Sequence, residues 1–206
     1  NNTKLDFKNF FYTKDVIPLP VKKFKSSNDN KALIFLYGFP DNPIRPLNGF
    51  ENGNRINIKT FTYFLEFYNK IKIPKSKIYL RIQDNNFDYL KKSIKLKINK
   101  PKFENCKILS LKNSLKTANL CINFFLGTPF LESLFYNKPT ILIYDETINM
   151  NFDKNFLKIL KSLEKNNIVF KDLKKAIDFV NINHIEIDKW WNQKRVQEVR
   201  EKFCVS

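Results

Sequence analysis

The feature that most constrains the fold is a repeated alternation of short apolar runs with segments of helical periodicity. Residues 32–37, 119–125 and 140–144 are nearly continuous apolar runs. Such runs are typical of strands buried on both faces of a parallel sheet. Between them lie segments such as 58–71, where apolar residues recur every three or four positions. We therefore predict an α/β domain of three layers with a mainly parallel sheet.

The same patterns assign the individual elements. The predicted strands are 32–37, 77–82, 107–110, 119–125, 140–144 and 168–170. The predicted helices are 58–71, 86–95, 112–117, 129–136, 153–165, 172–182 and one terminal helix over 188–203. Residues 1–30 are polar, rich in lysine and interrupted by prolines, so we expect a linker or irregular lead-in there. The domain would then occupy 31–187, and 188–206 would pack back on it as the terminal helix.

The formal net charge of +17 raises nucleic acid as a partner. However, only five of the 37 basic residues are arginine, and the lysines are scattered along the chain. Dedicated nucleic-acid surfaces favour arginine for bidentate contacts. The composition therefore argues against nucleic acid as the main partner, and a basic surface suits anionic substrates or an anionic membrane leaflet equally well.

Cysteine and histidine usage restricts the chemistry further. Cys106, Cys121 and Cys204 show no CxxC spacing, which favours a reducing, cytoplasmic setting without disulfides. His184 is the only histidine, so a multi-histidine metal site or a Ser-His-Asp triad is hard to build. There is also no Asp-x-Asp pair to hold a metal-bound diphosphate, and we expect neither a metal nor a cofactor.

Two glycines come directly after predicted strands, Gly38 and Gly127. In parallel α/β folds ligands bind outside the carboxyl ends of the strands, so both glycines belong to the ligand-binding edge. The predicted loop after the first strand runs to about residue 57 and also holds Gly53, Arg45 and Arg55. A loop this long is usually functional or mobile. Either arginine could contact a phosphate or be a solvated loop charge.

The most informative local motif is Gly127-Thr128-Pro129, followed by Glu132. Thr128 suits the N-cap of a helix and Pro129 suits its first helical position. The free N–H groups and the positive end of the helix dipole favour an anion such as a phosphate. Glu132 then falls in the first turn, where it could complement the dipole or accept hydrogen bonds from the two hydroxyls of a ribose.

Three sequence blocks in this order resemble the donor-nucleotide half of GT-B glycosyltransferases, within a family of transferases encoded in bacterial surface-carbohydrate gene clusters. The blocks are Ile-Tyr-Leu-Arg-Ile at 78–82, Gly-Thr-Pro-Phe-Leu-Glu-Ser-Leu at 127–134 with Asn-Lys-Pro-Thr-Ile-Leu-Ile at 137–143, and Trp-Trp-Asn-Gln-Lys-Arg-Val-Gln-Glu-Val-Arg-Glu-Lys-Phe at 190–203. The resemblance covers residues 31–206. It implies that 31–187 is a Rossmann-like nucleotide-sugar-binding domain.

The resemblance also implies residue roles. Gly127, Thr128 and Pro129 would face the diphosphate or the sugar, Glu132 would hold the ribose, and Arg81 would neutralise phosphate charge. A surface salt bridge is the alternative role for Arg81. Two departures from the family pattern, Gln83-Asp84-Asn85 and Phe125-Leu126, leave open a degenerate module with a structural or partner-binding role.

The resemblance further implies the partners. The donor would be a nucleotide-sugar and the acceptor a glycan or a lipid-linked molecule. The N-terminal half of the same enzyme, or a partner subunit, would complete the active site and supply any catalytic base. We expect a cytoplasmic location, compatible with peripheral contact with the inner membrane. The rival from a different class is a basic nucleic-acid-binding α/β domain.

The tryptophan pair near the end of the sequence and two aspartates each allow two interpretations. The Trp190-Trp191 pair is either a stacking platform for a sugar or an anchor that holds the terminal helix on the core. Asp84 and Asp145 lie near the carboxyl ends of predicted strands, where they could contact a sugar or remain solvated.

Overall fold

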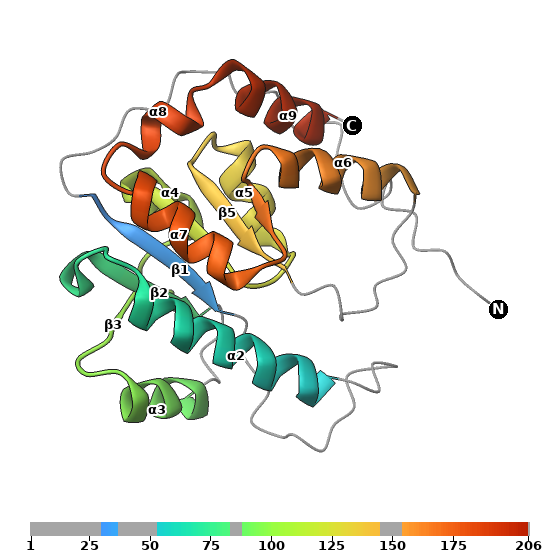
Figure 1. Ribbon diagram of the computed structural model, residues 1–206. Helices are drawn as coiled ribbons and strands as arrows, with labels where there is room; N and C mark the ends of the chain where they lie inside the picture. Colours follow the sequence, from blue (N-terminus) through green and yellow to red (C-terminus); the bar gives the residue numbers. More distant parts are fainter. Residues whose placement is uncertain (1–29, 37–52, 83–87, 145–153, 206) are drawn as a thin grey trace.

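The computed structural model describes residues 30–36, 53–82, 88–144 and 154–205, which form a sheet with helices on both faces (Figure 1). The strands in these ranges are β1 (Ala32–Leu36), β2 (Ile78–Ile82), β3 (Lys102–Phe103), β4 (Leu120–Asn123), β5 (Thr140–Ile143) and β6 (Val169–Phe170). The α-helices there are α2 (Gly53–Lys70), α3 (Asp88–Lys97), α4 (Leu111–Thr117), α5 (Thr128–Phe135), α6 (Lys154–Lys165), α7 (Leu173–Asn183), α8 (Ile187–Trp191) and α9 (Lys194–Val205), with a 3-10 helix, η1 (Lys75–Lys77).

The sheet has six strands in the order β3-β2-β1-β4-β5-β6, and every pairing within the described ranges is parallel. This is the strand order of a dinucleotide-binding Rossmann fold. The prediction of an α/β, Rossmann-like domain of three layers is confirmed. The buried apolar runs became strands because a parallel sheet hides both faces of each strand.

Successive side chains of each strand point to opposite faces of the sheet, where they pack into two apolar clusters. Leu33 and Cys121 pack with Leu115 of α4 in one cluster. On the other face Ile34 packs in the cluster that contains Phe67 of α2. Helices α2 and α7 lie side by side over this second face (Figure 1).

The prediction of a strand at 107–110 is wrong. The third strand is β3, and its Lys102 and Phe103 pair with Tyr79 and Leu80 of β2. The apolar Ile108 is instead 82% exposed in a turn. Ser110 then caps α4, because its side chain accepts a hydrogen bond from the Asn113 N–H. Two apolar residues between polar ones are too short a pattern to separate a turn from a strand.

Helix α2 begins earlier than predicted. It starts at Gly53, so Gly53 and Arg55 belong to a helix and not to the loop in which the sequence pattern placed them. The predicted lead-in, residues 1–30, lies outside the described residues except for Asn30. No helix in the described ranges is long and apolar enough to cross a membrane.

The single terminal helix predicted over 188–203 is also wrong, because α8 ends at Trp191 and α9 begins at Lys194. Trp190 and Trp191 are buried, with their ring centroids 5.2 Å apart. The indole N–H of Trp190 donates to the Asn166 carbonyl, and that of Trp191 donates to Asn137. Buried rings cannot stack on a sugar from solvent, so the pair anchors the terminal helices to the core.

Candidate functional site

The candidate site lies where the direction of strand succession reverses, between β1 and β4. The chain proceeds from β1 through β2 to β3 on one side and returns to β4 on the other. The connections at the carboxyl ends of β1 and β4 therefore diverge to opposite sides, which leaves a crevice that binds ligands in open α/β sheets. The sequence-predicted residues Arg81, Gly127, Thr128 and Pro129 lie at this edge because each ends or follows β2 or β4.

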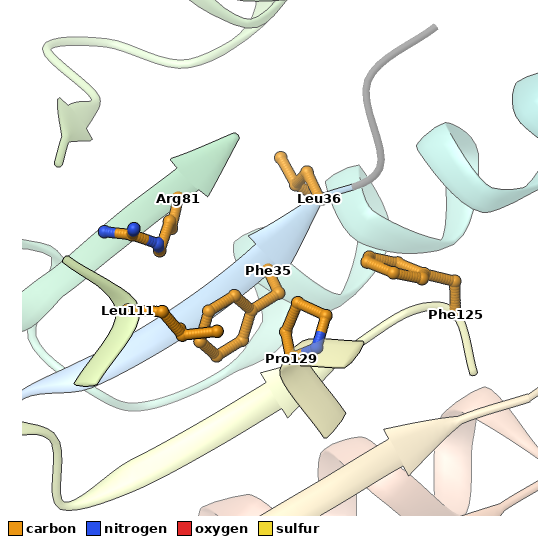
Figure 2. A pocket seen from close by; sticks show the side chains of 6 residues that line it. All are labelled: Phe35, Leu36, Arg81, Leu111, Phe125 and Pro129. Carbon is orange, nitrogen blue, oxygen red and sulfur yellow. The ribbon is translucent and has the colours of Figure 1, made fainter. Parts of the chain in front are cut away.

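A small cavity of about 90 Å³ opens at this point. Its lining residues are Phe35, Leu36, Arg81, Leu111, Phe125 and Pro129. Figure 2 shows Phe35 and Pro129 close together at its centre, with Arg81 and Leu111 on one side and Phe125 on the other. The lining is apolar and aromatic apart from one guanidinium, so a flat or apolar group with a nearby negative charge suits it best.

Arg81 lies on β2 directly beside Phe35 of β1. The alternative prediction of a salt bridge is confirmed, but not its place at the surface, because Arg81 pairs with Glu104 and its side chain is only 10% exposed. The Nη1 group donates to Glu104 Oε2 at 3.1 Å, to the Leu109 carbonyl at 3.0 Å and to Ser114 Oγ at 2.8 Å. The two hydrogens of this one nitrogen are shared among the three acceptors, which together hold the guanidinium in one place.

Glu104 organises this cluster, although the sequence pattern did not indicate it. Its carboxylate also accepts a hydrogen bond from Lys31 Nζ at 2.5 Å. Burial raises the pKa of Glu104, but hydrogen bonds from Lys31, Ser114 and Arg81 and the charge of Lys31 outweigh burial and hold the pKa below its usual value. Two cations facing one carboxylate leave one net positive charge beside the cavity.

Helix α5 begins one residue earlier than predicted. Gly127 is the N-cap and Thr128 is already helical, so the assignment of Thr128 as N-cap is wrong. Glycine fits because the cap makes no side-chain hydrogen bond. The N–H groups of Phe130 and Leu131 both donate to the Gly127 carbonyl, and Pro129 has no N–H. Among the described residues this leaves the Thr128 N–H as the first-turn amide available to an anion.

Alanine at position 127 is expected to displace the ring of Phe125 from the cavity wall. A Cβ at this position would lie 2.6 Å from Phe125 Cε2, which is too close for any ordinary contact. We expect Gly127→Ala to reduce the free energy of unfolding by about 1 kcal/mol, because the ring must move. Urea denaturation measures this loss, and Phe125→Ala in the same background should remove the clash. Strictly additive losses in the double variant would contradict the contact.

Glu132 lies in the second turn of α5, since the first turn contains no acidic residue. The alternative that it complements the helix dipole from the first turn is therefore wrong. Burial raises the pKa of Glu132, and the positive charge of Arg81 partly opposes this rise. Within the described part of the chain the Glu132 carboxylate forms neither a hydrogen bond nor an ion pair, so this half-buried group is available to a ligand.

Several predicted site residues cannot be placed. Gly38, Arg45, Asp84 and Asp145 lie outside the described residues. Of the predicted site residues, Arg81 and Pro129 line the same cavity, whereas Gly127, Thr128 and Glu132 are not among its lining residues. Glu104 and Lys31 join the site through their contacts with one another and with Arg81.

A protein-family model described as "LIC12162 family transferase" matches residues 8–206 of the chain. The match includes every described element of the sheet and both terminal helices. No curated protein matches the chain.

Proposed function

The chain belongs to the LIC12162 family of transferases, and we propose that it is the donor-nucleotide-binding half of a glycosyltransferase. The parent enzyme would transfer a sugar from a nucleotide-linked donor to a cell-surface glycan or to a lipid-linked acceptor. The second half of the active site would come from another part of the same enzyme or from a partner subunit.

The observation that carries this proposal is that Arg81 and Pro129 line one cavity at the switch point of the sheet, with Glu132 on the helix that begins there. Arg81 comes from β2 and Glu132 from α5, and the charge of Arg81 acts on the pKa of the Glu132 carboxyl. A nucleoside diphosphate presents both an anion and a pair of ribose hydroxyls. A guanidinium suits the anion, and a carboxylate without a hydrogen-bond or ion-pair partner among the described residues suits the two hydroxyls.

The fixed positive charges at the site support a reaction in which the leaving diphosphate is stabilised without a metal ion. Lys31 and Arg81 together exceed the charge of Glu104 by one positive unit. The Thr128 N–H and the amino end of α5 add a partial positive charge. Such fixed charges stabilise the negative charge that develops on the leaving phosphate as the sugar departs.

Replacement of Glu132 by glutamine is expected to weaken nucleotide binding by about tenfold, because one charged hydrogen-bond acceptor is lost. Calorimetric titration of the full chain with UDP, GDP and CMP measures the affinities, which we expect in the micromolar to low-millimolar range. Glu66→Gln is the matched control, since Glu66 is an exposed residue of α2 that pairs with Lys70. This control should bind like the wild type.

The same titration includes a short single-stranded DNA. Binding of DNA alone, with a strong dependence on salt, would favour the basic nucleic-acid-binding alternative. An unchanged nucleotide affinity in Glu132→Gln would contradict the role of this carboxylate. Absence of binding to all four probes would favour the structural or partner-binding alternative.

A further inference from the structure

The side chain of Asn123 has an unsatisfied polar atom at the centre of the domain. Asn123 is the last residue of β4 and its side chain is completely buried. Its Nδ2 group donates to the Ile141 carbonyl over a long distance of 3.4 Å. Its Oδ1 atom has no hydrogen-bond partner among the described residues. A buried polar atom without a partner costs free energy, so its presence calls for an explanation.

Other buried polar side chains in the described ranges do have partners. Ser133 Oγ donates to the Pro129 carbonyl at 2.6 Å, and Thr140 Oγ1 donates to the Lys138 carbonyl at 2.8 Å. Asn119, one residue before β4, donates to Asn30 Oδ1 at 2.9 Å. The interior of this domain therefore satisfies polar groups in general, and Asn123 is the exception within the described part.

Asn123 shares a row with two residues that line the cavity. Phe35 of β1 pairs with Arg81 on one side and with Asn123 on the other. Directly paired residues of neighbouring strands point to the same face of a sheet. Because Nδ2 is directed at the carbonyl of Ile141 in β5, Oδ1 branches away from that strand. The row Arg81–Phe35–Asn123 thus places a cation and a buried amide on either side of Phe35, whose ring lines the cavity.

We infer that Asn123 orients the bound donor, with its Oδ1 atom accepting a hydrogen bond from a hydroxyl or N–H group of the nucleotide-sugar. This inference rests on the proposed function. An amide oxygen only accepts hydrogen bonds, so it cannot bind phosphate oxygens, which are acceptors too. The diphosphate belongs beside Arg81, and the group that reaches Asn123 is an uncharged one on the sugar or the base.

The inference predicts that stability and binding respond in opposite directions when the amide is removed. In Asn123→Leu the unsatisfied atom is gone, so we expect the ligand-free protein to melt at or above the wild-type midpoint. The affinity for the nucleotide that the wild type binds best, out of UDP, GDP and CMP, should fall about tenfold. A residue with a purely structural role would not produce this combination.

Asn119→Leu is the matched control, because it makes the same substitution at a buried asparagine whose amide has a partner. We expect its melting midpoint to fall and its nucleotide affinity to stay unchanged. Asn123→Val, with a smaller side chain, replaces Asn123→Leu if the larger residue prevents folding.

Two results would overturn the inference while the proposed function stands. One is a melting midpoint lowered in both Asn123 variants, as in Asn119→Leu, which would make the amide structural. The other is an unchanged nucleotide affinity in a folded Asn123 variant. Failure of the wild-type chain to bind any of the three nucleotides would instead contradict the proposed function itself, and this inference with it.

Discussion

Replacement of Trp191 by alanine is expected to lower the free energy of unfolding by about 3–5 kcal/mol, as for other large aromatic residues removed from a core. The side chain is fully buried and contacts Trp190. Its indole N–H donates to Asn137 Oδ1 at 2.8 Å. The variant therefore loses both apolar burial and a buried hydrogen bond, and it leaves the Asn137 amide oxygen without that donor.

The effect should extend to the candidate site, because the terminal helices hold the carboxyl end of α5. Asn137 follows α5 with a φ of 51°, a left-handed conformation that asparagine tolerates better than most residues. Arg200 of α9 donates from Nη1 to the Leu134 carbonyl of α5 at 3.1 Å. Gln197 ties α9 to α8 through the Trp191 carbonyl. Loss of Trp191 removes its contact with Asn137, and with it one of the contacts that fix the helix carrying Glu132.

Urea denaturation of the full chain measures this loss, and two variants calibrate it. Trp191→Phe keeps most of the ring and loses the N–H donor, so it should cost about 1–2 kcal/mol. Leu96→Ala changes a side chain that is 84% exposed and should cost less than about 0.5 kcal/mol. A loss in Trp191→Ala as small as that in Leu96→Ala would show that the terminal helices do not support the core.

Replacement of Glu104 by glutamine is expected to cost about 3 kcal/mol, because it leaves two buried cations without a counter-charge. The Glu104 side chain is 2% exposed, and those of its partners Lys31 and Arg81 are 14% and 10% exposed. Glu66→Gln breaks the exposed pair with Lys70 and should cost about 0.5 kcal/mol or less. Equal losses in the two variants would show that the buried cluster contributes no more than a surface pair.

The pH dependence of this difference tests its electrostatic origin. Since hydrogen bonds and the charge of Lys31 overcome burial and lower the pKa of Glu104 below 4.5, its ionised form stabilises the folded protein. This contribution is complete above the unfolded-state pKa and is lost as the pH falls through the folded-state pKa. The stability gap between wild type and Glu104→Gln should therefore shrink progressively as the pH falls below about 4.5. A constant gap down to about pH 3 would indicate a packing effect.

Much of the fold followed from local patterns in the sequence. The strands near 32–37 and 140–144 were predictable because continuous apolar runs of this length are buried on both faces. The alternation with helical segments was enough to predict a parallel sheet. The two-residue strand β3 was missed, because only its pairing with β2 distinguishes it from a loop. The break between α8 and α9 was missed as well, since neither glycine nor proline marks it.

The candidate site was predictable only in part. Gly127 was found because it follows an apolar run, and the carboxyl ends of parallel strands meet at one edge. Glu132 was found because it follows Gly127 on the next helix, and Arg81 was singled out by the resemblance to the glycosyltransferases. Glu104 was missed, because its partner Lys31 is 73 positions away in the chain. The one local signal for Asn123 was a carboxamide inside an apolar run.

The sequence by itself therefore determined which segments are buried strands, which are amphipathic helices and which residues stand at the ligand-binding edge. These properties depend on the periodicity of burial, and a few neighbouring residues are enough to encode it. Only the tertiary structure decided that β4 lies beside β1, that Glu104 faces two cations and that the Asn123 oxygen has no hydrogen-bond partner in the described part of the chain. Those outcomes depend on strand order and on contacts between distant segments, which no local pattern specifies.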